Sequence, residues 1–316
     1  MNYYIGVDLG GTNIVVGLVS EDYQIIDRCT CLTNLPRPAT AIVDNIAKLI
    51  RQLLVKQNLT IEDIRSIGVG VPGTANKETG MVEYANNLGF YDVPFVSLLK
   101  EHFDTKICFD NDGNAAAWGE YLAGCGKGYH SLIAITLGTG VGGGIVMNDQ
   151  LYTGSNYAAA EIGHHVICMD GVPCNCGRDG CFEAYASATA LIEQTKAAMD
   201  LNKESYLWEL CEGDINRVEG KILFDAVAKG DNTASMVLEQ FIKYLSVGIT
   251  NLINIFQPDI LCIGGGISKA GSIFIEPLIE RVNRGIYTRN SLKQTKIVIA
   301  ELDNDAGIIG AAHLVY

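Results

Sequence analysis

Several features that are common in other proteins are missing from this sequence. It contains no G-x-x-x-x-G-K-[ST] segment, which excludes an ordinary P-loop nucleotide site. No apolar stretch is long enough to span a membrane, and the first residues lack the basic and apolar regions of a signal peptide. There is also no Pro-rich linker and no low-complexity segment. We therefore expect a cytoplasmic protein without a membrane partner.

Basic residues are in the minority. The chain has 23 Lys and Arg against 36 Asp and Glu, a formal net charge of −13, which opposes binding to nucleic acid. A nucleotide is still compatible, because backbone N–H groups and Mg²⁺ can hold its phosphates. The ten cysteines, without a secretion signal, indicate reduced thiols in the cytoplasm. With 316 residues, 48% of them hydrophobic, the chain is long enough for two α/β domains.

Cysteine is concentrated in one short stretch. His164, Cys174, Cys176 and Cys181 lie within eighteen residues, and thiolate and imidazole are good ligands for Zn²⁺. Two glycines between the cysteines allow the tight backbone that such close ligands require. Ordinary reduced cysteines in a core are the alternative. However, three of the ten cysteines fall within eight residues that are otherwise mostly polar or Gly, so we predict a closed structural zinc site.

Two carboxylates, Glu161 and Glu183, bracket this cluster. Four ligands complete a tetrahedral zinc, so both carboxylates are left to accept hydrogen bonds from a polyhydroxy ligand. The alternative is that both are solvated surface residues, as most glutamates are.

A first glycine-rich turn, Asp8-Leu-Gly10-Gly11-Thr12-Asn13, separates two short apolar runs. This pattern predicts a β-hairpin whose tip can approach a phosphate closely. The carboxylate of Asp8 is suited to position Mg²⁺, which prefers oxygen ligands. A plain hairpin turn is the alternative.

A second glycine-rich segment, Gly138-Thr139-Gly140 and on to Gly144, lies between strand-like runs at 131–137 and 145–147. By letter it matches G-x-G-x-x-G, but that dinucleotide fingerprint must open a helix, and here a strand follows. We therefore predict a second hairpin that resembles the first.

A third glycine-rich segment, Gly264-Gly265-Gly266, follows a strand-like run at 259–263 and precedes a helical one. Three glycines allow the backbone to contact a base or a ribose closely. A plain strand-to-helix turn is the alternative.

The carboxylate of Asp112 stands where a strand-like run at 106–110 meets an alanine-rich, helical stretch. Open α/β sheets bind their ligands at such carboxyl ends of strands. The position is also the natural N-cap of the helix, and the two roles are compatible.

Apolar periodicity predicts helices at 39–56, 184–199, 232–256 and 306–316. The two similar hairpins indicate two halves built on one plan, each offering a phosphate loop to a shared cleft. We place the domains at 1–115 plus 303–316 and at 116–302.

The zinc stretch resembles the signature of the ROK family of repressors and sugar kinases. It reads Glu161-x-Gly-His164, then Cys174-x-Cys-Gly-x-x-Gly-Cys181-x-Glu183. The similarity extends over essentially the whole chain and includes the glycine-rich segments. It implies an α/β, two-domain actin/hexokinase-type (ribonuclease H-like) fold with an interdomain cleft.

The same resemblance implies residue roles, with Asp112 as the catalytic general base. The residues implied in sugar binding are Gly73, Asn87, Asn111, Asp112, Glu161, His164 and Glu183. The residues implied in nucleotide binding are Asp8, Gly10, Gly11, Thr12, Asn13, Gly138, Thr139, Gly140, Gly264, Gly265 and Gly266. The implied cofactors are ATP, Mg²⁺ and a structural Zn²⁺ on His164, Cys174, Cys176 and Cys181, and a homodimer is implied as well.

The implied activity is transfer of the γ-phosphoryl group of ATP to a primary hydroxyl of a hexose. The segments 84–94 and 183–187 most resemble the glucokinase-type branch of the family, which favours glucose. A kinase for another hexose, such as N-acetylmannosamine, fructose or allose, is one alternative. A non-catalytic sugar sensor is another, but ROK repressors carry a DNA-binding segment before the first phosphate loop. Asp8 is only eight residues from the start, so we expect a kinase.

Overall fold

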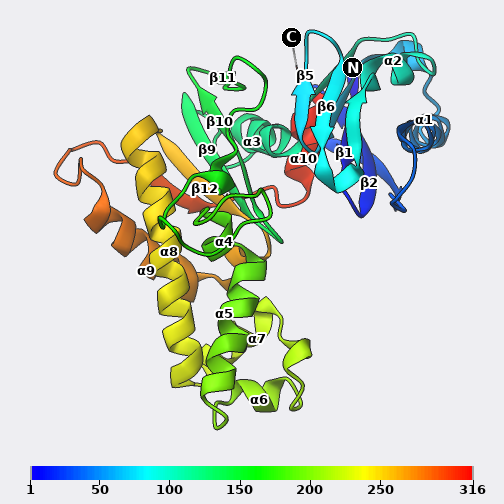
Figure 1. Ribbon diagram of the computed structural model, residues 1–316. Helices are drawn as coiled ribbons and strands as arrows, with labels where there is room; N and C mark the ends of the chain where they lie inside the picture. Colours follow the sequence, from blue (N-terminus) through cyan, green and yellow to red (C-terminus); the bar gives the residue numbers. More distant parts are fainter. Residues whose placement is uncertain (1, 315–316) are drawn as a thin grey trace. The chain divides into compact units, whose positions relative to one another are not determined.

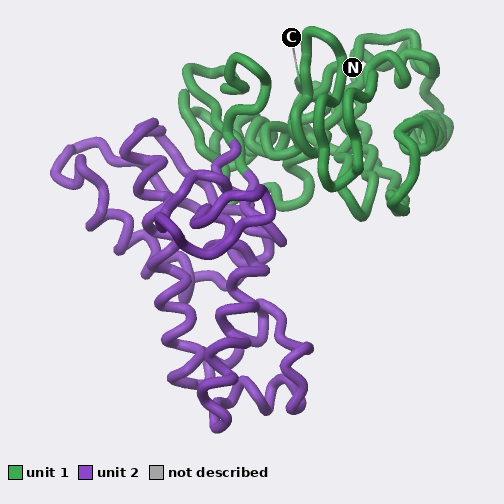
Figure 2. Tube along the Cα trace, viewed as in Figure 1, with its two compact units in different colours: residues 1–134, 143–160, 300–316 green, residues 135–142, 161–299 purple. Residues whose placement is uncertain are grey.

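The structure is a computed structural model that describes residues 2–314. It contains two compact units (Figure 2). Unit 1 comprises the residues up to 134, residues 143–160 and the residues from 300 on, and unit 2 comprises residues 135–142 and 161–299. The domain border that we predict near residue 115 rests on the plan of two similar halves, and it stays a prediction.

Unit 1 is built on a mixed sheet with the strand order β3-β2-β1-β4-β8. Its strands are β1 (Tyr3–Leu9), β2 (Asn13–Ser20), β3 (Ile25–Leu32), β4 (Ile64–Val71) and β8 (Ile107–Asn111). A small antiparallel sheet of β5 (Thr74–Asn76), β6 (Met81–Ala85) and β7 (Phe90–Val93) follows β4. The helices of this unit are α1 (Ala39–Lys56), α2 (Phe95–Lys100), α3 (Asp112–Ala123) and α10 (Asp305–Ala312).

Strands β1, β4 and β8 run parallel, whereas β1, β2 and β3 are antiparallel neighbours. The carboxyl ends of parallel strands meet at one edge of a sheet. That edge therefore carries the β1–β2 turn, the segment after β4 and the start of α3, which are three of the segments that the sequence singles out.

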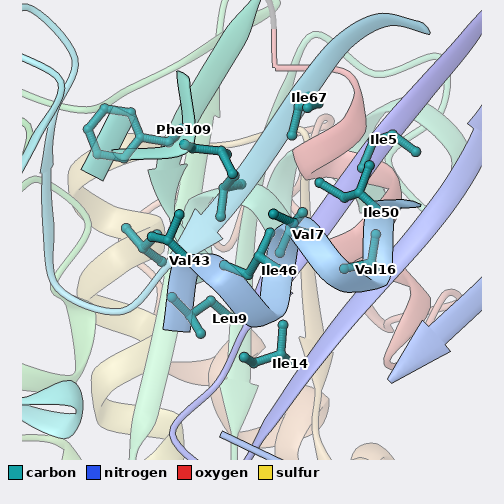
Figure 3. Packing of buried hydrophobic residues seen from close by; sticks show 14 of the residues in the cluster. Ile5, Val7, Leu9, Ile14, Val16, Val43, Ile46, Ile50, Ile67 and Phe109 are labelled. Atoms are coloured by element: carbon teal, nitrogen blue, oxygen red, sulfur yellow. The ribbon is translucent and has the colours of Figure 1, made fainter. Parts of the chain in front are cut away.

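One face of this sheet is covered by α1. Ile5 and Val7 are two positions apart in β1, so both side chains lie on that face. Val43 and Ile46 of α1 pack in the same cluster (Figure 3). All four side chains are essentially inaccessible to solvent. The period of two along the strand and the helical spacing along α1 explain why these stretches form this layer.

The opposite face is covered by α3 and α10, which lie beside each other (Figure 1). Here the helix backbone rests directly on the sheet. A Cβ on Gly6 would lie 2.0 Å from the carbonyl oxygen of Ile308, and a Cβ on Gly68 would lie 1.7 Å from that of Ala311. Glycine at these strand positions therefore permits the close packing that holds α10 on the sheet.

A second sheet has the strand order β11-β10-β9-β12-β13. Its strands are β9 (Ser131–Leu137), β10 (Val141–Met147), β11 (Gln150–Leu151), β12 (Ile260–Gly264) and β13 (Lys296–Ile299). The helices of unit 2 are α4 (Glu183–Ala186), α5 (Ala188–Leu201), α6 (Leu207–Leu210), α7 (Gly220–Ala228), α8 (Asn232–Phe256) and α9 (Ser272–Gly285). The long helix α8 packs along α5, and it buries residues such as Val237, Phe241 and Leu245 at a spacing of one helical turn (Figure 1).

Among residues 2–314, no helix has both the length and the apolar character needed to cross a membrane.

Three sequence-based predictions about elements differ from the structure. The helix predicted at 306–316 ends at Ala312, as α10, and residues 315–316 of that prediction lie outside the described residues. The helix predicted at 184–199 is divided at Ser187, whose hydroxyl caps α5 by accepting from the N–H of Ala190 at 3.1 Å. The strand predicted at 145–147 begins earlier, at Val141. Gly144 in this strand is needed for packing rather than for a turn, because a Cβ on it would lie 2.5 Å from the Cβ of Ala117 in α3.

Candidate functional site

The first glycine-rich turn is a tight hairpin, as predicted. The β1–β2 pairing ends at Leu9 and Ile14, and the N–H of Gly10 donates to the carbonyl of Asn13 at 2.9 Å. The hydroxyl of Thr33, the residue that follows β3, donates to the carbonyl of Gly10 at 2.7 Å and supports the turn. Residues 11–13 are exposed, so the tip presents its backbone at the carboxyl edge of the sheet.

The carboxylate of Asp8 lies next to this turn and close to the start of α10. A Cβ on Gly307 would lie 3.3 Å from the Cγ of Asp8, so a larger residue there would crowd the carboxylate. Burial raises the pKa of Asp8 above its ordinary value of 3.8. A desolvated carboxylate at this position gains from a nearby cation, which fits the role predicted for Asp8.

The junction between β8 and α3 carries Asn111 and Asp112. Asn111 caps the helix: its Oδ1 accepts from the N–H groups of Gly113 at 2.8 Å and Asn114 at 3.2 Å. The prediction that Asp112 is the cap is therefore wrong by one residue. Asp112 is the first helical residue, and its Oδ1 accepts from the N–H of Gly113 at 2.9 Å. With the cap supplied by its neighbour, the carboxylate of Asp112 is not required for that role.

Gly73 lies against the same junction. Its carbonyl accepts a hydrogen bond from Nδ2 of Asn111 at 3.1 Å. Its φ of +85° favours glycine, and a Cβ would lie 1.9 Å from the carbonyl oxygen of Tyr84. Asn87 is exposed in a 3₁₀ turn, and its Cβ lies 3.9 Å from where a Cβ on Gly11 would be. Unit 1 thus brings the first glycine-rich turn close to Asn87, and Gly73 to Asn111.

Unit 2 brings the second glycine-rich turn together with Glu183. The N–H of Gly138 donates to the carbonyl of Gly140 at 3.0 Å and closes the turn. The N–H of Val141 donates to Oε2 of Glu183 at 2.9 Å. A Cβ on Gly140 would lie 2.3 Å from the same oxygen, so glycine leaves room for this carboxylate.

The third glycine-rich segment lies against the end of β9. Gly265 has a φ of +90°, and a Cβ on it would lie 2.3 Å from the carbonyl oxygen of Leu137. Because Gly138 follows Leu137 directly, the segments 138–140 and 264–266 are neighbours within unit 2. Thr139 and Gly266 are exposed, so both segments present part of their backbone to solvent.

The predicted metal ligands form one cluster. The ligand atoms of His164, Cys174, Cys176 and Cys181 all lie within 4.8 Å of one another. Nδ1 of His164 is 3.7 Å from the Sγ of Cys174, and the sulfur atoms of Cys176 and Cys181 are 3.6 Å apart. This donor set and its compactness suit a tetrahedral metal ion. That the cluster binds zinc stays a prediction.

Glu161 is the first of the two glutamates that bracket the cluster. As a whole residue it is exposed to solvent, but nearby protein atoms partly desolvate its carboxyl group. This burial raises the pKa of Glu161, and the nearby Glu183 raises it further, whereas His164 opposes the shift. The N–H of His164 donates to the carbonyl of Glu161 at 3.0 Å, so these residues form one short turn. Glu161, His164 and Glu183 are therefore neighbours within unit 2.

Comparison with known proteins identifies the family. The model of the ROK family matches residues 4–316. The chain belongs to the ROK family. A curated glucokinase of Thermotoga maritima is 38% identical to this ROK protein over 98% of this chain and 96% of the relative. The xylose repressor of Caldicellulosiruptor bescii is 29% identical over 98% of this chain and 77% of the repressor.

A solved structure supports the same assignment. The ROK family glucokinase from Streptomyces griseus, in complex with glucose and AMPPNP, is 32% identical to this chain. Its TM-score is 0.83, and the match covers 98% of each chain. The predictions of ROK membership and of a two-domain actin/hexokinase-like α/β fold are therefore confirmed.

The sequence did not reveal one feature of this ROK protein. Lys77 and Asp110 form an ion pair of 2.5 Å next to Asn111, and their side chains are 13% and 1% exposed. No motif marks Lys77, and Asp110 reads as the last residue of a strand. The one available signal is a charged residue at the end of an otherwise apolar strand, which predicts a buried partner but does not identify it.

Proposed function

We propose that this protein is an ATP-dependent glucokinase, which transfers the γ-phosphoryl group of ATP to O6 of glucose. The observation that carries the proposal is the likeness, over almost the whole chain, to curated glucokinases and to a ROK family glucokinase structure. The arrangement of charged and polar groups at strand and helix ends in both units is consistent with it.

In this proposal Asp112 accepts the proton of the attacking hydroxyl. General base catalysis of this kind contributes typically about 10²–10⁴-fold to the rate. The position of Asp112 at the start of α3, with Asn111 as the cap, supports this assignment. The residues proposed to hold the sugar are Gly73, Asn87, Asn111, Glu161, His164 and Glu183. Fixing the sugar so that its hydroxyl points at the phosphate lowers the entropic part of the barrier.

We assign the nucleotide to the glycine-rich segments. The backbone at residues 10–13 and 138–140, which is exposed at 11–13 and 139, is suited to hydrogen-bond phosphate oxygens, and residues 264–266 are suited to contact adenosine. Mg²⁺ that arrives with ATP neutralises phosphate charge. Asp8 is proposed to orient the ion, which would also relieve the cost of burying its carboxylate.

We infer that the cluster of His164, Cys174, Cys176 and Cys181 holds a structural Zn²⁺. Burial, with the neighbouring thiols, raises the pKa of Cys181 to about 12, so at neutral pH this thiol keeps its proton unless a cation such as Zn²⁺ replaces it. Four ligands leave no open position for a substrate. The ion would keep the loop with Glu161 and Glu183 rigid. Since Nδ1 of His164 faces Cys174, we assign its Nε2 to the sugar.

Three further expectations stay proposals. We propose that the protein works in the cytoplasm, that it forms a homodimer, and that it needs neither nucleic acid nor a membrane. The charge of −13 supports the last of these.

The test is a panel of sugars with ATP: glucose, mannose, fructose, allose, N-acetylglucosamine and N-acetylmannosamine. We expect kcat/KM for glucose to exceed that for each other sugar by about a hundredfold, since a site that hydrogen-bonds each hydroxyl rejects isomers strongly. A preference for another hexose would replace the substrate but keep the chemistry. Binding of ATP and sugar without turnover would favour the sensor over the kinase.

A further inference from the structure

A buried ion pair holds the junction between β8 and α3, which we call the Asn111–Asp112 turn. Nζ of Lys77 lies 2.5 Å from Oδ2 of Asp110. The other oxygen, Oδ1, accepts hydrogen bonds from the N–H of Asn111 at 2.8 Å and from Nδ2 of Asn114 at 2.9 Å. One carboxylate therefore joins Lys77 to residues on both sides of Asp112.

The same turn is held from two further directions. Gly73, at the start of the segment that carries Lys77, accepts from Nδ2 of Asn111 at 3.1 Å. In the sheet Gly70 of β4 pairs with Asp110, and a Cβ on Gly70 would lie 3.4 Å from the Cα of Asp112. The start of α3 thus packs closely on the sheet, directly beside the ion pair.

This pair differs from other lysine ion pairs of the chain in its burial. The lysine side chain is 13% exposed in Lys77, against 60% in Lys56 and 84% in Lys293. Removing two charges from water costs about as much as their attraction returns, so such a pair adds little net stability. Its hydrogen bonds, however, define one geometry for the backbone that they touch.

We propose that Lys77 and Asp110 are positioning residues for the phosphoryl transfer. Lys77 fixes the carboxylate of Asp110, this carboxylate fixes the Asn111–Asp112 turn, and the turn determines the point from which Asp112 accepts the proton. The inference rests on the proposed function, which makes Asp112 the base. It assigns neither Lys77 nor Asp110 a contact with sugar or ATP.

The first test is Lys77→Met, which removes the charge and keeps most of the side-chain volume. We expect kcat for glucose to fall about tenfold to a hundredfold while KM for glucose changes by about threefold or less, because a displaced base affects the transition state more than sugar binding. An unchanged kcat in the folded variant, or a higher KM at unchanged kcat, would overturn the proposal.

Two control variants separate positioning from general damage. Lys293→Met removes an ion pair with the same distance of 2.5 Å, to Asp259 in unit 2. Ile46→Ala opens a cavity in the core on the opposite face of the unit 1 sheet. Both should keep the wild-type kcat at a temperature at which all variants are folded. A loss of kcat in Ile46→Ala equal to that in Lys77→Met would show that destabilisation alone explains the effect, which contradicts the proposal.

Amide hydrogen exchange tests the positioning without relying on turnover. In Lys77→Met, protection at the amides of Asn111, Gly113 and Asn114 should fall at least about tenfold more than at the amides of β4, because the loss is local. In Ile46→Ala protection should fall in both places together. A wild-type protein that phosphorylates no sugar would refute the proposed function, yet this experiment would still decide on the positioning. Equal protection at the α3 start in Lys77→Met and wild type would overturn it.

Discussion

The carboxylate of Glu183 accepts a hydrogen bond from the backbone N–H of Val141 at 2.9 Å. Glu183 begins α4 two residues after Cys181, so this bond ties the loop of the cysteine cluster to the second glycine-rich turn. Within unit 2, one side chain joins a segment that we assign to the sugar and a segment that we assign to the phosphates. Removing the whole side chain of Glu183 should therefore affect both the sugar and ATP.

Two substitutions of Glu183 separate its two contacts. Glu183→Gln keeps an oxygen that can accept from Val141, whereas Glu183→Ala removes it. We expect both variants to raise KM for glucose, and only Glu183→Ala to raise KM for ATP, by about tenfold, because losing a hydrogen bond to a charged group costs about 1.5–3 kcal/mol. Steady-state kinetics with each substrate varied will measure this. If both variants raised KM for ATP equally, the bond to Val141 would not support the turn.

The metal prediction is tested by two cysteines in the same loop. Cys174→Ser removes one of the four clustered ligands, whereas Cys168→Ser changes an exposed cysteine outside the cluster. We expect about one zinc per chain in wild type and Cys168→Ser. In Cys174→Ser we expect lost zinc and a Tm lower by at least about 5 °C, because structural zinc contributes directly to folding free energy. Metal analysis and thermal unfolding check both points. Active wild-type protein without metal would contradict the prediction.

The raised pKa of Asp8 predicts a conflict between stability and function. A carboxyl group whose pKa is raised by folding stabilises the protein below its ordinary pKa of 3.8 and loses this contribution as the pH rises through the raised value. At pH 7 the charged Asp8 therefore costs stability. We expect Asp8→Asn to raise Tm without nucleotide by about 2–4 °C and to weaken Mg–ATP binding.

The pH dependence distinguishes this effect from an unrelated gain. The difference in Tm between Asp8→Asn and wild type should vanish near pH 4 and grow toward pH 7. Asp104→Asn, at an exposed position, serves as a control and should leave Tm unchanged. A lower Tm in Asp8→Asn at pH 7 would show that the carboxylate is stabilised by its surroundings instead.

Long elements with strong periodicity could be predicted from the sequence. The bounds of α1 and α8 agree with the predicted ones, because each helix buries one regular set of apolar residues. The family motifs were also sufficient to predict the fold class. In both cases the signal lies within a short stretch of sequence.

Features that depend on tertiary contacts could not be predicted. Gly143 and Gly144 look like part of a turn, but they lie in β10, and α3 packs on them. Ser187 divides a predicted helix, so that the N–H of Ala188 can donate to the carbonyl of Gly138 at 2.8 Å. The partners Lys77 and Asp110 are distant in sequence, and their types alone do not show that they meet. Each of these contacts affects the segments that we assign to catalysis or to nucleotide binding.

The most direct test of the proposed mechanism is the turnover of Asp112→Asn with glucose and ATP. The amide has nearly the same shape and can still accept from the N–H of Gly113, but it cannot take up the proton of the hydroxyl. We predict that kcat falls at least about 10²–10⁴-fold, while the dissociation constant for glucose stays within a few-fold of wild type. A kcat close to that of the wild type would contradict the account, because Asp112 would then not be the base.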